Sequence, residues 1–223
     1  MRLADMITAN PSVMLMLPRF GIRTGFGNAK VDDVCRQNHV PTDFFLLVCN
    51  VYSFDDYIPS ADAIAGTDMT CLIDYLCASH AFYTDSRLPH IESHLNHLAV
   101  KAGKYGQALL MFYADYKHEM AEHFAYEESV VYPHLQSLQN DATVKHSYHI
   151  ATYARRHGNV EDKLNDLIQL IFKDMPATCM EDETMEMIFD ILQFSADLNK
   201  HALIEEKILI PYVEMLEQQH RKA

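Results

Sequence analysis

Two stretches of this sequence match each other: HFAYEESVVYPHL at residues 123–135 and HALIEEKILIPYV at residues 201–213. Both read H-x-x-x-E-E and end near a proline. A histidine and a glutamate four residues apart lie on one face of a helix, one turn from each other. Apolar neighbours turn that face toward a core, where a carboxylate is costly unless it is paired or binds a metal. One such motif is usually a surface ion pair, but two matched copies favour a shared cation site.

The chain around the two copies has the pattern of long helices, because apolar residues recur at three- and four-residue spacing. We expect four helical segments: 68–101, 104–138, 142–174 and 181–218. The predicted breaks are at Gly103 and Gly106, at Asn140-Asp141 and near Pro176. Long helices with short connections predict an all-α fold, with an up-down-up-down four-helix bundle over residues 67–220.

Residues 1–60 predict a small helical domain of their own, in which prolines and glycines keep the helices short. Val31 to Arg36 reads as one or two helical turns. Thr42 is expected to cap a helix from Asp43 to about Phe54. The small and polar residues from Pro59 to Gly66 predict a linker to the bundle.

Charge and composition exclude several classes of protein. The formal net charge is −13, with 31 acidic against 18 basic residues, which argues against nucleic acid and anionic lipid as partners. No run of 18 apolar residues occurs, so no membrane-spanning helix is expected. An early Asp5 and the lack of a small-residue cleavage site argue against a signal peptide. Five cysteines without a CxxC pair favour a reducing cytoplasm over a disulfide framework.

The thirteen histidines fall into two groups by their height along the predicted helices. A helix rises about 1.5 Å per residue, so the distance from a connecting loop gives that height. One histidine from each helix reaches the same layer: His80, His123, His157 and His201. The other nine are expected to be solvated or to cap helices: His39, His90, His94, His97, His118, His134, His146, His149 and His220.

Four imidazoles with Glu127 and Glu205 suit iron, manganese or zinc. Two glutamates at one level, each able to bridge, imply two metals about 3.5–4 Å apart. The set has no cysteine, which disfavours a closed structural zinc site. Octahedral ions would keep positions open for an oxo bridge, water or a diatomic ligand, and this openness indicates reactivity.

These motifs resemble the hemerythrin HHE cation-binding family, and the resemblance covers about 155 residues. The N-terminal segment, through FGIRTGFGNAKVDDVC and FFLLVCN, resembles the small leading domain of the RIC (repair of iron centres) di-iron proteins. The resemblance implies a non-haem di-iron centre. Its iron ligands would be His80, His123, His157 and His201, and Glu127 and Glu205 would bridge. It also implies a role in iron–sulfur cluster repair after nitric oxide or oxidative damage.

The sequence departs from these families at two places. The RIC leading domain usually has a Cys-Cys pair where this chain has Gly25-Phe26-Gly27. Oxygen-carrying hemerythrins typically have a further histidine where this chain has Glu161, which disfavours simple oxygen carriage. Glu161 is either solvated, a neighbour of the ligands or an additional ligand. Tyr153 lies one turn before His157 and either packs in the core or donates a proton to a bound oxygen species.

Two functional interpretations follow, and they leave open whether the protein is an enzyme. In the first, a cytoplasmic di-iron protein reacts with oxygen, nitric oxide or peroxide, or assists damaged iron–sulfur proteins. In the second, the bundle is an oxygen or iron sensor without turnover. A purely structural bundle is the weakest interpretation, because it leaves the duplicated motif unexplained.

Overall fold

The computed structural model describes residues 1–140, 149–156, 162–179 and 182–222. The described residues are helical and contain no strand, apart from one antiparallel bridge between Arg2 and Lys30. The all-α prediction is therefore confirmed for this part of the chain. The chain divides into two compact units, which we describe separately. Unit 1 comprises Met1–Ser79, His134–Ala154 and Lys200–Ala223, and unit 2 comprises His80–Pro133 and Arg155–Asn199.

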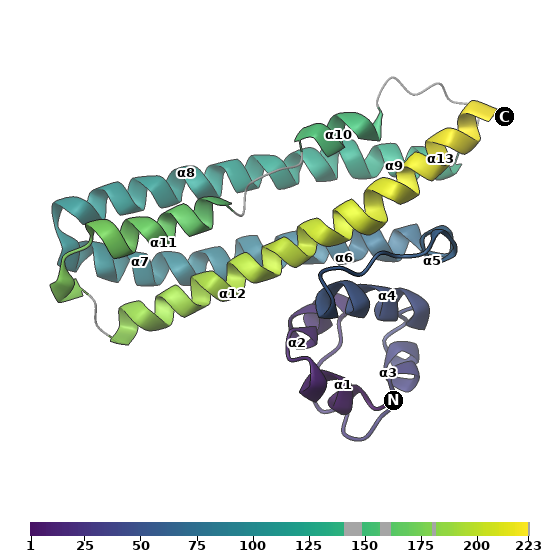
Figure 1. Cartoon of the computed structure of the whole chain (residues 1–223), viewed down its shortest axis with the longest axis horizontal. Helices are drawn as coiled ribbons and strands as arrows, with labels where there is room; N and C mark the ends of the chain where they lie inside the picture. Colours follow the sequence, from purple (N-terminus) through teal and green to yellow (C-terminus); the bar gives the residue numbers. More distant parts are fainter. Residues whose placement is uncertain (141–148, 157–161, 180–181, 223) are drawn as a thin grey trace. The chain divides into compact units, whose positions relative to one another are not determined.

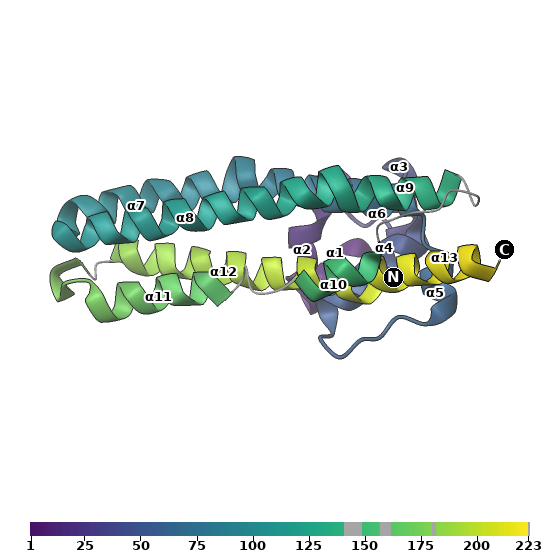
Figure 2. The same ribbon diagram turned by 90° about the horizontal axis from the view of Figure 1, so that it is seen from above.

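Unit 2 is built from long helices around one apolar core. Its main elements are α7 (Leu88–Ala102), α8 (Lys104–Tyr126), α11 (Asp162–Asp174) and the part of α12 (Asp182–Ile204) up to Asn199. Helices α7 and α8 pack against each other and run in opposite directions (Figures 1 and 2). Each helix contributes fully buried side chains to the core, for example Leu95, Tyr113, Leu164 and Ile191.

The two glycines expected to mark the break between the first and second helical segments behave differently. Gly103 separates α7 from α8 with φ of 59°, a conformation that glycine adopts without strain. Gly106 lies inside α8, so the prediction of a break there is wrong. A Cβ atom at this position would come within 2.2 Å of the Ala99 carbonyl oxygen. Gly106 is therefore the residue that lets the two helices approach closely.

Within the described residues, wide π-helical turns interrupt the long helices at η2 (Tyr83–Arg87), η3 (Glu127–Val131) and η5 (Glu205–Leu209). In each turn a backbone N–H bonds the carbonyl five residues earlier, as Tyr132 does to Glu127. A proline follows each turn: Pro89, Pro133 and Pro211. Proline lacks the N–H for the usual helical bond, and its ring crowds the carbonyl four residues before it. A wider turn relieves that crowding and makes Glu127 and Glu205 the first residues of their turns.

Unit 1 contains the N-terminal helices α1 (Leu3–Ala9), α2 (Val13–Met16), η1 (Leu17–Phe20), α3 (Val31–Gln37), α4 (Thr42–Ser53), α5 (Ala61–Ala65) and α6 (Met69–Phe82) up to Ser79. It also holds α9 (Tyr132–Asn140) from His134, α10 (Ile150–Arg156) up to Ala154, the end of α12, η5 and α13 (Ile210–Lys222). Phe20 packs against Phe44, Phe45 and Tyr75 in its core, with ring centroids 4.7–5.7 Å apart.

One local expectation for the N-terminal region is wrong, and the segment predicted as a linker is partly helical. Thr42 is the first residue of α4 rather than its cap, and its hydroxyl donates to Asp32 at 3.1 Å. The expected linker contains the short helix α5, whose start is capped by the Ser60 hydroxyl accepting from Ala63 N–H at 3.2 Å. The domain boundaries at residues 60 and 67 and the up-down topology of the whole bundle stay predictions.

Candidate metal centre

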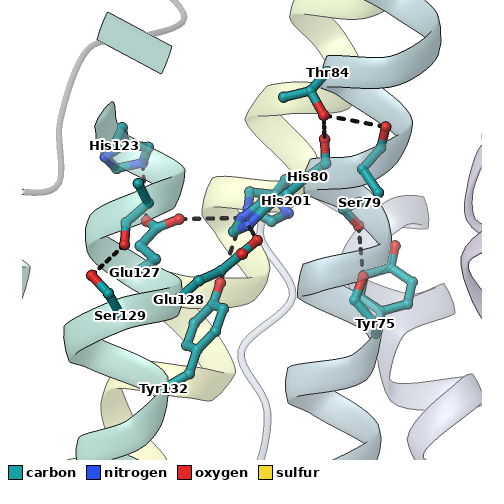
Figure 3. Close-up of polar contacts among 12 residues, drawn as sticks. Tyr75, Ser79, His80, Thr84, His123, Glu127, Glu128, Ser129, Tyr132 and His201 are labelled. Atoms are coloured by element: carbon teal, nitrogen blue, oxygen red, sulfur yellow. Dashed lines mark hydrogen bonds and ion pairs between the residues drawn. The ribbon is translucent and has the colours of Figure 1, made fainter. Parts of the chain in front are cut away.

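Glu127 lies between two histidines of unit 2 and has no exposed surface. Its Oε1 is 3.0 Å from His123 Nε2, one helical turn earlier on α8. Its Oε2 is 3.2 Å from Nε2 of His80, which lies near the end of α6 (Figure 3). The two carboxylate oxygens therefore face two different imidazoles from two different helices. The contact with His123 follows from the four-residue spacing on α8, and Glu127 is also the first residue of the π-turn η3.

His80 is held by contacts on several sides. Its Nδ1 donates to Glu128 Oε1 at 2.8 Å, so the second glutamate of the motif fixes the imidazole (Figure 3). Phe124 stacks on the ring with centroids 4.0 Å apart and planes 12° apart. The Tyr132 hydroxyl lies 3.5 Å from Nε2. A carboxylate on the far nitrogen of a histidine is the usual support of a metal ligand, because it fixes the tautomer.

The contacts of Glu127 require a proton or a metal ion next to its carboxylate. With Nδ1 of His80 protonated toward Glu128, a neutral ring presents the lone pair of Nε2 to the carboxylate. Two acceptors 3.2 Å apart repel each other unless a proton or a metal ion lies between them. When a proton lies on Nε2 of both rings instead, burial still opposes ionisation of Glu127, but the hydrogen bonds from His123 and His80 outweigh it and hold the pKa of this carboxyl well below its usual range.

A metal ion fits these distances. Two ligands that are each about 2.1 Å from an ion and at right angles to each other are about 3.0 Å apart. The two nitrogen–oxygen distances at Glu127 are 3.0 and 3.2 Å. The donor set of imidazole nitrogen and carboxylate oxygen is one that iron, manganese and zinc all accept. The residues present therefore fit the cation that the sequence implied.

The second copy of the motif lies in unit 1 and repeats the first in outline. His201 and Glu205 are buried candidate metal ligands, as His80 and Glu127 are. His201 Nε2 lies 3.6 Å from Glu205 Oε2, and the two side chains are 4 and 0 % exposed. Glu205 also begins a π-turn, so both copies present their first glutamate in the same way.

Two residues singled out from the sequence, His157 and Glu161, lie outside the described residues. Tyr153 is described on α10 and is 1 % exposed. This burial agrees with a packing role and does not test the proposed proton donation. The predicted roles of these three residues therefore stay predictions.

Among the remaining histidines, His134 departs from the expected solvated or capping role. It is 7 % exposed, and its Nε2 lies 3.3 Å from Glu217 Oε1. The prediction was wrong because distance from the metal layer says nothing about burial elsewhere in the protein. His97 and His118 have mostly exposed side chains, at 67 and 74 %. The side chains of His146 and His220 lie outside the described part of the chain.

Neither the contact of Glu128 with His80 nor the π-turns before the prolines were predicted. Both had visible signals, because the motif has two consecutive glutamates and each copy ends near a proline. A third proline, Pro89, also marks the π-turn after His80, where Tyr83 stands in the position of the glutamates.

A buried carboxylate set between imidazoles on long helices defines a cation-binding helical protein. A model of the hemerythrin HHE cation binding domain matches residues 87–213, more than half of the chain. The chain therefore belongs to the hemerythrin HHE cation binding domain family. The match includes His123, Glu127, His201 and Glu205 but begins after His80, whose place rests on the geometry alone. No curated protein and no solved structure gave a significant match.

Two further predictions concern membrane-spanning helices and disulfides. None of the helices in the described segments is both long enough and apolar enough to span a membrane. All five cysteines lie in the described residues, and no disulfide joins any two of them.

Proposed function

We propose that this protein is a non-haem di-iron protein of the hemerythrin type that acts on small oxidising or nitrosating molecules. The observation that supports the proposal is that the two buried oxygens of Glu127 face two different imidazoles. A carboxylate in this position can bridge two ions, with His80 binding one ion and His123 the other. The repeat supplies a second set, His201 and Glu205, and His157 completes the six ligands.

The chain's own residues give the iron a defined setting. Glu128 fixes the His80 ring, and Phe124 covers one of its faces, so that this ligand keeps one orientation. The His123 side chain is 22 % exposed, whereas that of His80 is 3 % exposed, so the His123 side of Glu127 is the one nearer to solvent. Bound iron would supply binding and redox chemistry toward oxygen, nitric oxide or peroxide.

The proposed physiological role is the response to nitrosative or oxidative stress, including repair of damaged iron–sulfur proteins in the cytoplasm. The support for this role is the resemblance of residues 1–60 to the RIC leading domain. Neither nucleic acid nor a membrane surface is proposed as a partner, because the net charge of −13 repels both.

One observation favours a second candidate, an oxygen or iron sensor without turnover. Burial raises the pKa of Cys35 to about 11 and that of Cys49 to about 12. Thiols with such pKa values stay protonated and are poor nucleophiles or metal donors. The N-terminal region therefore offers no reactive thiolate from these two residues for handling a cluster.

Metal analysis and an optical spectrum of the aerobically purified full-length protein test the shared core of both candidates. We expect about two iron ions per chain. A chain with normal helical content and no iron, manganese or zinc would contradict the proposal. Nitric oxide added to the reduced protein then separates the candidates, because turnover consumes it whereas a sensor releases it when the gas is removed. His123→Ala is the control for both measurements.

A further inference from the structure

A second group of metal-binding side chains lies within unit 2, on α7 and α12. His90 and His94 are one turn apart on α7, with ring centroids 4.8 Å apart. Asp190 of α12 lies beside them, with its Oδ2 3.0 Å from His90 Nε2. One ligand atom from each of the three residues lies within 4.8 Å of the other two. We propose that His90, His94 and Asp190 bind one divalent transition-metal ion of the zinc or copper class, at a site separate from that of Glu127.

His94 has an unsatisfied ring nitrogen. Its Nδ1 is buried and makes no hydrogen bond, and the Glu183 Oε1 atom is 3.9 Å away, beyond hydrogen-bonding distance. A buried ring nitrogen without a partner is unfavourable. A bound cation removes this deficit in either of two ways. It can use Nδ1 directly, or it can bind the opposite nitrogen and so fix a proton on Nδ1 toward Glu183.

Asp190 is already oriented for such a role. Arg87 holds its Oδ1 through Nη2 at 3.4 Å, and this leaves Oδ2 directed at His90. The side chains of His90, His94 and Asp190 are 47, 25 and 32 % exposed. An ion can therefore enter from solvent, and water can complete its coordination. His90 follows His80 by ten residues, about 15 Å along a helix, so the two sites do not share ligands.

The chemistry of the set selects the class of ion. Two imidazoles four residues apart on a helix with one carboxylate form a three-ligand set that zinc accepts with an open position. Imidazole also suits copper and nickel, whereas magnesium and calcium prefer oxygen alone. Ligands about 2.1 Å from one ion are at most about 4.2 Å apart. Binding therefore needs only a small rotation of the exposed His90 ring.

The test adds Zn²⁺ to full-length protein that has been exposed to iron, and measures zinc and iron in the same dialysed samples. The parent protein should bind about one zinc per chain in addition to its iron. His94→Ala and Asp190→Asn should weaken this zinc binding at least about tenfold. His97→Ala, an exposed histidine on the same helix, is the matched control and should change it less than about twofold.

Three results would overturn the proposal: no additional zinc in the parent, equal zinc binding by the parent and both variants, or loss of iron equal to the zinc gained. Should His94→Ala fail to fold by circular dichroism, His90→Gln replaces it, because that ring is half-exposed. The proposal does not rest on the di-iron function. Protein that binds no iron should still show the difference between parent and variants.

Discussion

The two H-x-x-x-E-E copies share their spacing, their π-turn and their proline, yet their surroundings differ. In the first copy, His123 and His80 approach Glu127 at 3.0 and 3.2 Å, and the His123 side chain is 22 % exposed. In the second, His201 is 4 % exposed and lies 3.6 Å from Glu205. The local sequence thus sets the backbone and the place of the glutamate. Residues from elsewhere in the fold determine how exposed each histidine is and which charged groups surround each glutamate.

The second glutamate of the motif also has different surroundings in the two copies. Glu128 accepts a hydrogen bond from His80 Nδ1 at 2.8 Å, although its side chain is 47 % exposed. Glu206 occupies the same position of the second copy and is exposed to solvent. We therefore expect the first glutamates of the two copies to act alike and the second glutamates to act differently.

The largest effect should come from removing either first glutamate. Glu127→Ala and Glu205→Ala should each lower the metal content from about two ions per chain to less than about half an ion, because each is proposed to bridge both ions. Elemental analysis of the purified proteins measures this. The matched control is Glu122→Ala, whose side chain is 69 % exposed and should not affect metal. Full occupancy in either bridging variant would show that the copies do not form one centre.

The second glutamates provide a sharper test. Glu128→Gln keeps the shape of the side chain but removes the charge that orients His80. It should lower metal affinity about 10- to 100-fold, as the loss of a carboxylate behind a ligand usually does. Glu206→Gln should leave the affinity unchanged. Competition with a chelator measures both variants, and equal affinities would mean that the contact between Glu128 and His80 has no role in binding.

The sequence was sufficient for the helical fold and for the two copies, because periodicity and spacing are local properties. It also predicted that His80 and His123 lie at one level, since helix rise converts residue number into height. It did not predict Glu128 as the partner of His80, because that contact depends on how two helices are rotated. Gly106 was misassigned for a similar reason, since a glycine in a tight helix contact and a glycine in a turn look the same in sequence.

The segments that follow the two copies also meet within unit 1, and this contact should depend on pH. Glu217 on α13 faces His134 and His149 at 3.3 and 3.5 Å and accepts from Ile150 N–H at 2.9 Å. Burial opposes its ionisation, but the Ile150 N–H and the two imidazoles outweigh this and lower the pKa of Glu217 below its ordinary 4.5.

A lowered pKa fixes the sign of the pH effect. The stabilisation is present above the ordinary pKa and is lost as pH falls through the lowered one. Glu217→Gln should therefore cost about 1–2 kcal/mol near neutral pH and much less in strong acid. Urea unfolding at a series of pH values measures this difference. A constant difference between parent and variant across the acid range would contradict the assignment.

The smallest effect is expected where the N-terminal helices touch the second copy. Lys200 precedes His201 and donates to the Val51 carbonyl at 3.3 Å, and it also pairs with Asp55, whose side chain is 78 % exposed. The hydrogen bond from Lys200 lowers the pKa of Asp55, so this contribution too is lost in acid. Solvent screens such a pair, and Asp55→Asn should cost only about 0.2–1 kcal/mol and less at high salt. Asp56→Asn, at an exposed neighbour, is the control, and neither variant should change metal content. A loss of metal in Asp55→Asn alone would mean that the N-terminal helices hold the second copy in place, and that its difference from the first begins there.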